Sequence, residues 1–309
     1  MRSDIERLVE AVAQRVQLRL VDELRTTPCT ATAEECEGDG LCAARRAGDV
    51  EAIRRAGASR VGASPGVGAV RPDLAGMIDH TLLAPEAGVP DVQRLCAEAM
   101  RYRFAAVCVN PWLVAAAAAA LRGSRSNGHA TPGRHPKDLP VVASVVGFPF
   151  GANTTEVKAT EAARAIEDGA REIDMVVALG ALRSGDVGTV RAEIEAVARV
   201  VHQAPGARLK VILETAALTQ EQMIVGCRCA AEGEADFVKT STGFHPAGGA
   251  TVEHVRLLYR HASPIRVKAS GGIRTLAALS AMVAAGACRI GTSSGVAIME
   301  ALFTQEASS

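Results

Sequence analysis

Short runs rich in β-branched residues alternate with helical runs from about residue 73 onward, and this alternation limits the possible folds more than any other feature of the chain. Parallel strands need a long crossover, usually a helix, so regular alternation predicts a parallel sheet with helices outside it. Most runs are near-continuous in Val, Ile and Ala, as expected of strands buried on both faces. The eight candidates span residues 76–83, 105–110, 141–148, 172–178, 209–214, 236–242, 265–272 and 288–294.

Eight similar βα units in roughly 230 residues predict an α/β fold, a (β/α)8 TIM barrel. Signals for helix starts lie between the runs, at Pro90 with Asp91, at Thr219 with Gln222, and at Thr251. A doubly wound open sheet is the structural alternative. It is disfavoured because no GxGxxG pattern follows the first strand, where a dinucleotide-binding sheet would carry one.

The first seventy residues do not follow the barrel pattern. They begin with a predicted amphipathic helix, and a polar stretch, a cysteine-containing segment and the Gly-rich run VGASPGVGAV follow it. We therefore expect two parts, a helical N-terminal extension over residues 1–70 and the barrel over residues 71–309. The apolar side of the predicted helix consists of Ile5, Leu8, Val9, Val12, Val16 and Leu20.

Composition excludes several classes of protein. With 48% hydrophobic and 22% charged residues, the 309-residue chain has enough apolar material for a large core and too much for a disordered protein. Thirty-four basic and thirty-four acidic residues balance, so the overall field expected of a nucleic-acid or anionic-membrane binder is missing. The sequence has neither an 18-residue apolar stretch nor a basic, apolar leader at its start. We expect a cytoplasmic protein with no nucleic-acid or membrane partner.

The eight cysteines are better explained as reduced core thiols than as a disulfide framework. Cys29, Cys36 and Cys42 have the spacing C-x6-C-x5-C, which differs from a zinc knuckle, and a metal or iron–sulfur site there would need a fourth ligand from elsewhere. Cys227 and Cys229 lie two positions apart on a predicted helix and so point in different directions, which favours core packing. We predict no metal site.

A polar insertion over residues 122–140 has no apolar periodicity and predicts a solvated loop. His129 and His135 lie within it. Without a nearby cysteine or acidic cluster, two histidines are a weak indication of metal binding.

Three charged residues interrupt the apolar strand runs. Lys239, Lys268 and Asp174 hold equivalent positions in their units, and the carboxyl ends of barrel strands are where barrel enzymes carry their active sites. A structural ion pair is the simpler explanation for any one of them, but three in the same position predict a tuned site. One lysine could form a Schiff base while its neighbour's charge lowers its pKa, and the carboxylate could relay a proton. The pattern alone does not say which lysine is covalent.

Two Gly-rich loops follow the seventh and eighth strands, at residues 270–273 and 291–295, and each leads into a helix. Glycine permits close backbone approach, and N–H groups at helix starts bind phosphate. Either loop alone could be a simple tight turn. Both together, at the place where TIM barrels commonly hold phosphate, favour a phosphate site.

With these residues in view, the chain from about residue 73 to residue 303 resembles the deoxyribose-phosphate aldolases, which are class I aldolases on a TIM barrel. Several ordered motifs in different units carry the resemblance. They are MIDHTLL (77–83), VCVNP (107–111), VVGFPFG (145–151), EIDMVV (172–177), VILET (211–215), DFVKTSTGF (236–244), VKASGGIR (267–274) and RIGTSS (289–294).

The resemblance implies a role for individual residues. Lys239 corresponds to the family's Schiff-base lysine, Lys268 to the second lysine that lowers its pKa, and Asp174 to the proton-relay acid. The 5-phosphate would be bound by Gly243, Gly271, Gly272, Ser293 and Ser294. The rest of the pocket would be shaped by Asp79, Thr81, Cys108 and Thr240. The implied reaction is reversible cleavage of 2-deoxy-D-ribose 5-phosphate into acetaldehyde and D-glyceraldehyde 3-phosphate, without metal or organic cofactor.

Alternatives remain for the reaction and for the extension. The barrel could act on a different phosphorylated aldehyde acceptor, or it could bind a small phosphorylated sugar without catalysis. The N-terminal helix could pack on the barrel or at the interface of a homo-oligomer. Alternatively, residues 1–25 resemble the short amphipathic peptides that recruit enzymes into bacterial microcompartments through contact with shell or cargo, because a helix joined by a flexible linker precedes an enzyme that releases a reactive aldehyde.

Overall fold

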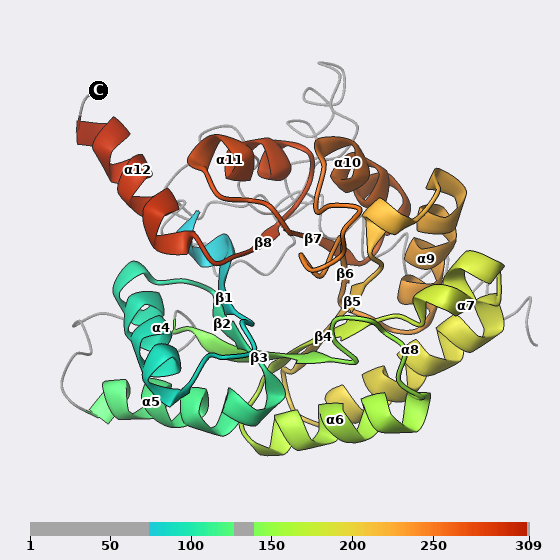
Figure 1. Ribbon diagram of the computed structural model, residues 1–309, viewed down its shortest axis with the longest axis horizontal. Helices are drawn as coiled ribbons and strands as arrows, with labels where there is room; N and C mark the ends of the chain where they lie inside the picture. Colours follow the sequence, from blue (N-terminus) through green and yellow to red (C-terminus); the bar gives the residue numbers. More distant parts are fainter. Residues whose placement is uncertain (1–73, 127–138, 308–309) are drawn as a thin grey trace, which may run out of the picture. The chain divides into compact units, whose positions relative to one another are not determined.

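In a computed structural model that describes residues 74–126 and 139–307, eight parallel strands close into a barrel in chain order, and β8 pairs with β1 (Figure 1). The predicted TIM barrel is confirmed, and every predicted strand is present. The strands are β1 (Ile78–Leu82), β2 (Ala106–Val109), β3 (Val141–Val146), β4 (Glu172–Val176), β5 (Arg208–Ile212), β6 (Phe237–Lys239), β7 (Arg266–Ser270) and β8 (Arg289–Thr292).

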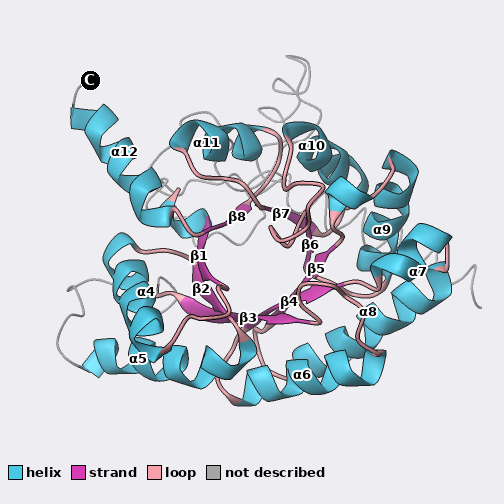
Figure 2. Cartoon of the chain, viewed as in Figure 1, coloured by secondary structure: helices cyan, strands magenta, loops and turns pink. Residues whose placement is uncertain are grey.

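Helices surround the strands on the outside (Figure 2). They are α4 (Val89–Tyr102), α5 (Val114–Ser126), α6 (Thr155–Glu167), α7 (Leu179–Ser184), α8 (Val187–Val201), α9 (Gln220–Glu232), α10 (Val252–His261), α11 (Leu276–Ala284) and α12 (Gly295–Ala307). Short 3-10 turns are η1 (Ala75–Met77), η2 (Pro111–Leu113) and η4 (Thr215–Ala217).

The predicted helix-start signals have the expected geometry. Thr219 accepts a hydrogen bond from the backbone N–H of Gln222, whose side chain accepts one from the N–H of Thr219, so the two form a capping box at α9. Thr251 caps α10 through the N–H of His254. These caps satisfy N–H groups that have no partner within the helix.

The predicted loop over residues 122–140 is wrong at its start, because α5 continues to Ser126. The Ala-rich run that forms this helix has high helix propensity and extends it into the polar segment. Residues 127–138, with His129 and His135, lie outside the described residues. So do the predicted helix over residues 5–20, Cys29, Cys36, Cys42, the Gly-rich run and the expected boundary near residue 70.

Apolar side chains fill the layer between the barrel and its helices, and a smaller cluster lies inside the barrel. Cys227 and Cys229 are buried in the outer layer, as predicted, whereas Cys288 at the start of the eighth unit is exposed. The inner cluster consists of Leu83, Ala106, Cys108, Ala143 and Val145. In the described part of the chain, no helix is long and apolar enough to cross a membrane, and no group of His, Cys, Asp and Glu is suited to hold a metal ion.

A buried ion pair joins the two helices that follow β3 and β4. Lys158 of α6 donates to Glu193 of α8 across 2.6 Å, and both side chains are almost fully buried. The other oxygen of Glu193 accepts the backbone N–H of Ala178, directly beyond β4. The Lys158 side chain lies under Gly147, where an added Cβ would be 2.9 Å from its Cε. The pair therefore fixes the ends of two strands that lead into the barrel mouth.

We predict that Lys158→Met lowers the free energy of unfolding by about 3–5 kcal/mol, because it leaves the Glu193 carboxylate buried without its cation. Urea-induced unfolding of the full chain measures the change. The control is Arg164→Met on the same helix, which removes an exposed pair with Asp168 and should change stability little. Equal losses in the two variants would contradict a structural role for the buried pair.

Candidate active site

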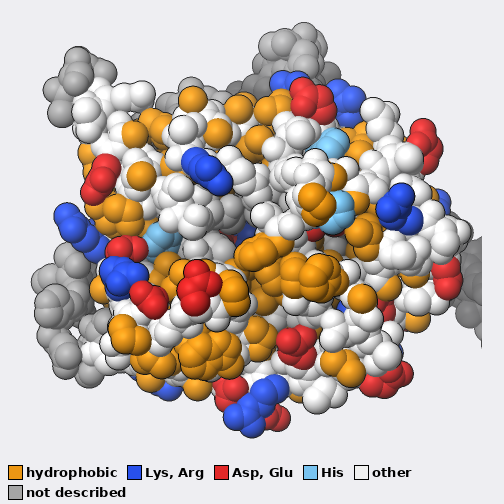
Figure 3. All heavy atoms as spheres, in the orientation of Figure 1, with side chains coloured by type: hydrophobic (Ala, Val, Ile, Leu, Met, Phe, Trp, Pro, Cys, Tyr) orange, Lys and Arg blue, Asp and Glu red, His pale blue; other side chains and the backbone are white. Residues whose placement is uncertain are grey.

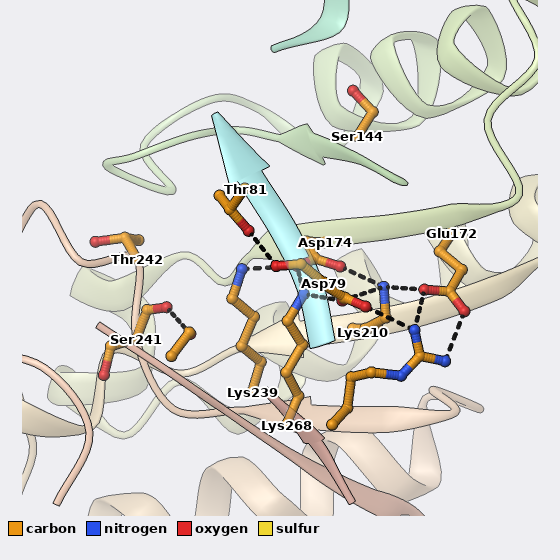
Figure 4. Close-up of polar contacts among 12 residues, drawn as sticks. Asp79, Thr81, Ser144, Glu172, Asp174, Lys210, Lys239, Ser241, Thr242 and Lys268 are labelled. Carbon is orange, nitrogen blue, oxygen red and sulfur yellow. Dashed lines mark hydrogen bonds and ion pairs between the residues drawn. The ribbon is translucent and has the colours of Figure 1, made fainter. Parts of the chain in front are cut away.

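Asp174 lies at the centre of the charged residues inside the barrel (Figure 4). The two lysines predicted from the sequence both bind one of its oxygens. Its Oδ2 accepts hydrogen bonds from Nζ of Lys239 and Nζ of Lys268, each at 2.6 Å. All three side chains are buried. The structure therefore brings together the three charged residues that the strand pattern singled out.

The strand register explains why these side chains meet. Lys239 of β6 is the direct register partner of Lys268 of β7, and Asp174 of β4 pairs in register with Lys210 of β5. Side chains at register partners point to the same face of a sheet, and here that face is the barrel interior. Gly291 on β8 makes room beside them, because a Cβ there would lie 3.1 Å from Cε of Lys268.

The sequence analysis missed Lys210, which is fully buried in the same network. Its Nζ donates to Oδ1 of Asp174 at 2.7 Å and lies 2.8 Å from Oε2 of Glu172. Asp79 was expected only to shape the pocket, yet it accepts a short hydrogen bond from Lys268 and one of 2.7 Å from Arg289. The periodicity contained a signal for Glu172, because residues two apart on a strand share a face and Asp174 had already been placed inside.

Because the charged side chains of this network are buried, the number of positive charges should match the number of negative charges. Arg208, whose side chain is 42% exposed, lies 3.7 Å from Glu172 at the edge of the network. Within the described residues the buried side chains of the network are four cations and three carboxylates. The cations are Lys210, Lys239, Lys268 and Arg289, and the carboxylates are Asp79, Glu172 and Asp174. A buried charge without compensation is costly, so the network is balanced when one of its amines is neutral.

The two predicted lysines differ in their tendency to lose a proton. Burial lowers the pKa of Lys239; Asp174 opposes this effect, and the positive charge of Lys268 adds to it. Burial also acts on Lys268, but Asp174 and Asp79 together outweigh it and raise the pKa of that amine. Asp174 itself is stabilised as a carboxylate, because its lysine partners outweigh burial and hold its pKa well below the usual range. Lys239 is therefore the amine that becomes neutral first.

The expected pocket residues lie close to this network. Thr81 on β1 uses its hydroxyl to donate to the carbonyl of Asp79. Thr240, directly after Lys239, exchanges hydrogen bonds with the backbone of Ser270. Cys108 on β2 is buried, and burial raises the pKa of its thiol to about 11, with the charge of Asp174 as the next contribution.

The expected phosphate-binding glycines form a close-packed group where the loops after β6 and β7 meet. Gly243 and Gly271 both have left-handed backbone conformations, with φ of 85° and 90°. A Cβ on Gly271 would lie 3.3 Å from Cα of Gly243 and 3.0 Å from Cα of Gly249. Glycine is therefore required here for both conformation and space.

The other expected phosphate ligands are also on this side of the barrel. Gly272, which is exposed, follows Gly271, and Ser293 and Ser294 lead from β8 into α12. Ser241 was missed by the sequence analysis. Its hydroxyl is buried beside the glycine group and has no hydrogen-bond partner among the described residues. A buried hydroxyl without a partner is available for a ligand.

Comparison with known proteins identifies the family of this barrel. Residues 74–303 match the pattern of the DeoC/LacD family aldolases. The chain belongs to this family. The resemblance found in the sequence is thereby confirmed, and the DeoC/LacD family is a family of lyases.

Two curated relatives of this DeoC/LacD aldolase are deoxyribose-phosphate aldolases from Thermococcus species. The protein of Thermococcus gammatolerans is 51% identical over 229 residues, which cover 74% of this chain and 96% of the relative. The protein of Thermococcus kodakarensis is 49% identical over the same shares of both chains. A solved tetrameric structure of deoxyribose phosphate aldolase from Aeropyrum pernix is 34% identical, has a TM-score of 0.65 and aligns over 75% of this chain and 92% of its own.

We predict that Lys239 of this aldolase reacts with acetic anhydride at lower pH than Lys268 does, because only the neutral amine is acylated and burial disfavours the charged form of Lys239. Labelling across a pH series, followed by peptide mass mapping, gives each amine a titration midpoint. The midpoint does not depend on how accessible the amine is, because each lysine is compared with its own plateau. A lower midpoint for Lys268 would contradict the assignment.

Proposed function

We propose that this aldolase reversibly cleaves 2-deoxy-D-ribose 5-phosphate to acetaldehyde and D-glyceraldehyde 3-phosphate through a Schiff base on Lys239. The observation that carries the proposal is the position of the Lys239 amine, buried 2.6 Å from Asp174 and beside a second lysine whose pKa is raised. The names of the relatives supply the substrate, and the geometry supplies the nucleophile.

Lys239 is the better nucleophile of the two lysines. Imine formation needs a neutral amine, and Lys268 is held in its charged form by two carboxylates. We therefore assign to Lys268 the role of the neighbouring cation. The charge count of the buried side chains agrees with this assignment, since a neutral Lys239 leaves three buried cations facing three buried carboxylates.

The steps follow from these positions. Lys239 attacks the C1 aldehyde, and loss of water gives an iminium that accepts the electron pair of the breaking C2–C3 bond. Asp174, through a water molecule, takes the proton of the C3 hydroxyl, so that D-glyceraldehyde 3-phosphate leaves and an enamine remains on Lys239. Protonation at C2 and hydrolysis then release acetaldehyde and restore the amine. Because its cation partners make Asp174 a weak base, we assign it a relay of protons rather than their storage.

The phosphate would be bound at the loops after β6, β7 and β8. We assign its contacts to backbone groups of Gly243, Gly271 and Gly272 and to Ser293 and Ser294 at the start of α12, where N–H groups favour an anion. Binding energy from this remote group would hold the C2–C3 bond against the catalytic residues. The small phosphorylated sugar is thus the proposed partner of the site.

Two other functions compete with this proposal. A different phosphorylated aldehyde acceptor would use the same imine chemistry. A barrel that only binds a phosphosugar would not need the buried lysine pair, and membership of an aldolase family disfavours it. Assembly into a homo-oligomer is a further proposal, supported by the tetrameric relative from Aeropyrum pernix.

We predict that Lys239→Arg abolishes cleavage of 2-deoxyribose 5-phosphate, because the guanidinium stays charged and cannot form an imine. It should also abolish the adduct that acetaldehyde and borohydride leave on the native protein. Peptide mass mapping of the trapped native protein should place the adduct on Lys239. An adduct on Lys268 instead would overturn the assignment of the nucleophile.

We also propose that residues 1–25 dock the enzyme in a bacterial microcompartment, and that residues 1–70 are separate from the barrel. The amphipathic spacing of the first residues and the start of the family match at residue 74 support this division. A docking helix carries its apolar face with it, so it should act on any protein to which it is joined.

We predict that the chain without residues 1–70 keeps most of its aldolase activity, because the family match does not include them. Residues 1–25 fused to a fluorescent protein should concentrate it in discrete bodies in the source organism. The matched control is the same fusion with Leu8→Glu and Val12→Glu, which removes the apolar face. Diffuse fluorescence of the native fusion, together with aggregation of the truncated aldolase, would assign the helix to the fold instead.

A further inference from the structure

Two loops from non-adjacent strands touch across the mouth of the barrel. Phe148 follows β3 and Phe244 follows β6, and their rings meet edge to face with centroids 5.2 Å apart and planes at 84°. In the closed barrel β4 and β5 lie between these strands, so the contact spans the carboxyl ends of the strands that carry Asp174 and Lys210. Edge-to-face packing of this kind is a favourable arrangement of aromatic rings.

The Phe148 ring packs against apolar side chains inside the barrel. It packs against the inner cluster that contains Cys108 and Ala143. The thiol of Cys108 lies near enough to Asp174, Lys268 and Lys239 for their charges to act on its pKa. The cluster against which the ring packs therefore adjoins the buried charges.

Phe244 is held in place from below by a buried carboxylate. Its N–H donates to Oγ1 of Thr242 at 3.1 Å, and the hydroxyl of Thr242 donates to Glu214 at 2.5 Å. Glu214 is buried at the end of β5, in a left-handed conformation with φ of 59° that is unusual for a residue other than glycine. Such a conformation persists where the surrounding structure imposes it, often next to a functional site.

On the other side of the mouth, the loop that carries Phe148 is also held by backbone hydrogen bonds. The N–H of Gly147 donates to Oε2 of Glu161 at 2.7 Å, and the N–H of Gly151 donates back to the carbonyl of Gly147 at 2.7 Å. Both rings are thus positioned by backbone hydrogen bonds within the protein itself.

Phe150 lies in the same loop as Phe148 but takes no part in the ring contact. Phe150 is 79% exposed and makes no aromatic ring contact with the described residues, whereas Phe148 is half-buried and Phe244, which is 51% exposed, contacts it. In Figure 3 hydrophobic side chains gather near the centre of this face of the molecule. Phe150 provides a matched control, because it shares the loop and the side chain but lies outside the contact.

We propose that Phe148 and Phe244 form an aromatic bridge over the barrel mouth that keeps bulk water from the Lys239 amine. The proposal rests on the proposed function, in which this amine is the nucleophile. Imine formation needs a neutral amine, and contact with water favours the protonated one. The bridge also limits the access of water to the iminium and enamine until the phosphorylated product has left.

The amine of Lys239 is faced by charged or titratable groups from several strands. Lys239 donates to Oδ2 of Asp174 on β4, the same oxygen that accepts from Lys268 on β7, and Cys108 on β2 acts more weakly. Lys210 on β5 and Asp79 on β1 complete the surrounding network. The bridge variants leave all of these groups in place, so a change in the titration of Lys239 in those variants reports a change in solvent access.

The test measures the titration midpoint of Lys239 by acetic anhydride labelling in the full chain. Phe148→Ala and Phe244→Ala should each raise the midpoint by about 0.5–1 pH unit, because water reaches the amine. Phe150→Ala should leave it at the native value. Phe148→Leu and Phe244→Leu keep the apolar volume but break the ring contact, and they replace the Ala variants if those do not fold.

Two results would overturn the bridge: midpoints of the Phe148 and Phe244 variants that match the native protein, or an equal shift in Phe150→Ala. Labelling does not require imine formation, so its result is independent of the reaction. Borohydride trapping with acetaldehyde on the same proteins tests the proposed function separately. A native protein that traps no aldehyde on Lys239 would refute the nucleophile while the labelling result still decides whether the bridge excludes water.

Discussion

The arrangement of the barrel interior depends on the compensation of buried charge around Asp174. A carboxylate taken out of water needs partners, and here Lys210, Lys239 and Lys268 supply them from three successive strands. The requirement is mutual, because each lysine is buried as well. These groups come within hydrogen-bond distance of one another through the strand register, the order of the strands and the small residue Gly291.

The same network gives the family chemistry a physical basis. Two lysines that bind one carboxylate oxygen have opposite titration behaviour, because only Lys268 has a second carboxylate beside it. A single additional neighbour, Asp79, thus helps to raise the pKa of Lys268 while burial lowers that of Lys239, which is the difference that the proposed mechanism requires. The fold supplies this difference through the pairing of β1 with β8, which closes the barrel and brings Asp79 next to the lysines.

The sequence predicted those site residues that differ in polarity from their neighbours in the chain. Lys239, Lys268 and Asp174 were visible because each interrupts an apolar strand, and the eight strands were visible because of their spacing. Arg289 was missed because it begins its strand, where a charge normally indicates solvent. Lys210 was missed because the predicted strand began at residue 209, whereas β5 begins at Arg208 and Lys210 lies at its centre. The contact of Phe148 with Phe244 could not be predicted, because it depends on the conformations of two loops far apart in sequence. The end of α5 was misplaced because helix propensity extended into a polar segment.

The residues beneath Asp174 close the barrel at its other end. Glu172 and Arg289 begin their strands, are buried and bond to each other in a bidentate pair, which fills this end of the barrel interior. We therefore expect reactants to enter and products to depart through the opposite end, at the carboxyl ends of the strands. In the proposed reaction the fragment that carries the phosphate lies outermost, and the two-carbon fragment is attached to the lysine behind it. In this arrangement the phosphorylated fragment leaves the barrel first. The two-carbon fragment can leave Lys239 only after the phosphorylated fragment has gone.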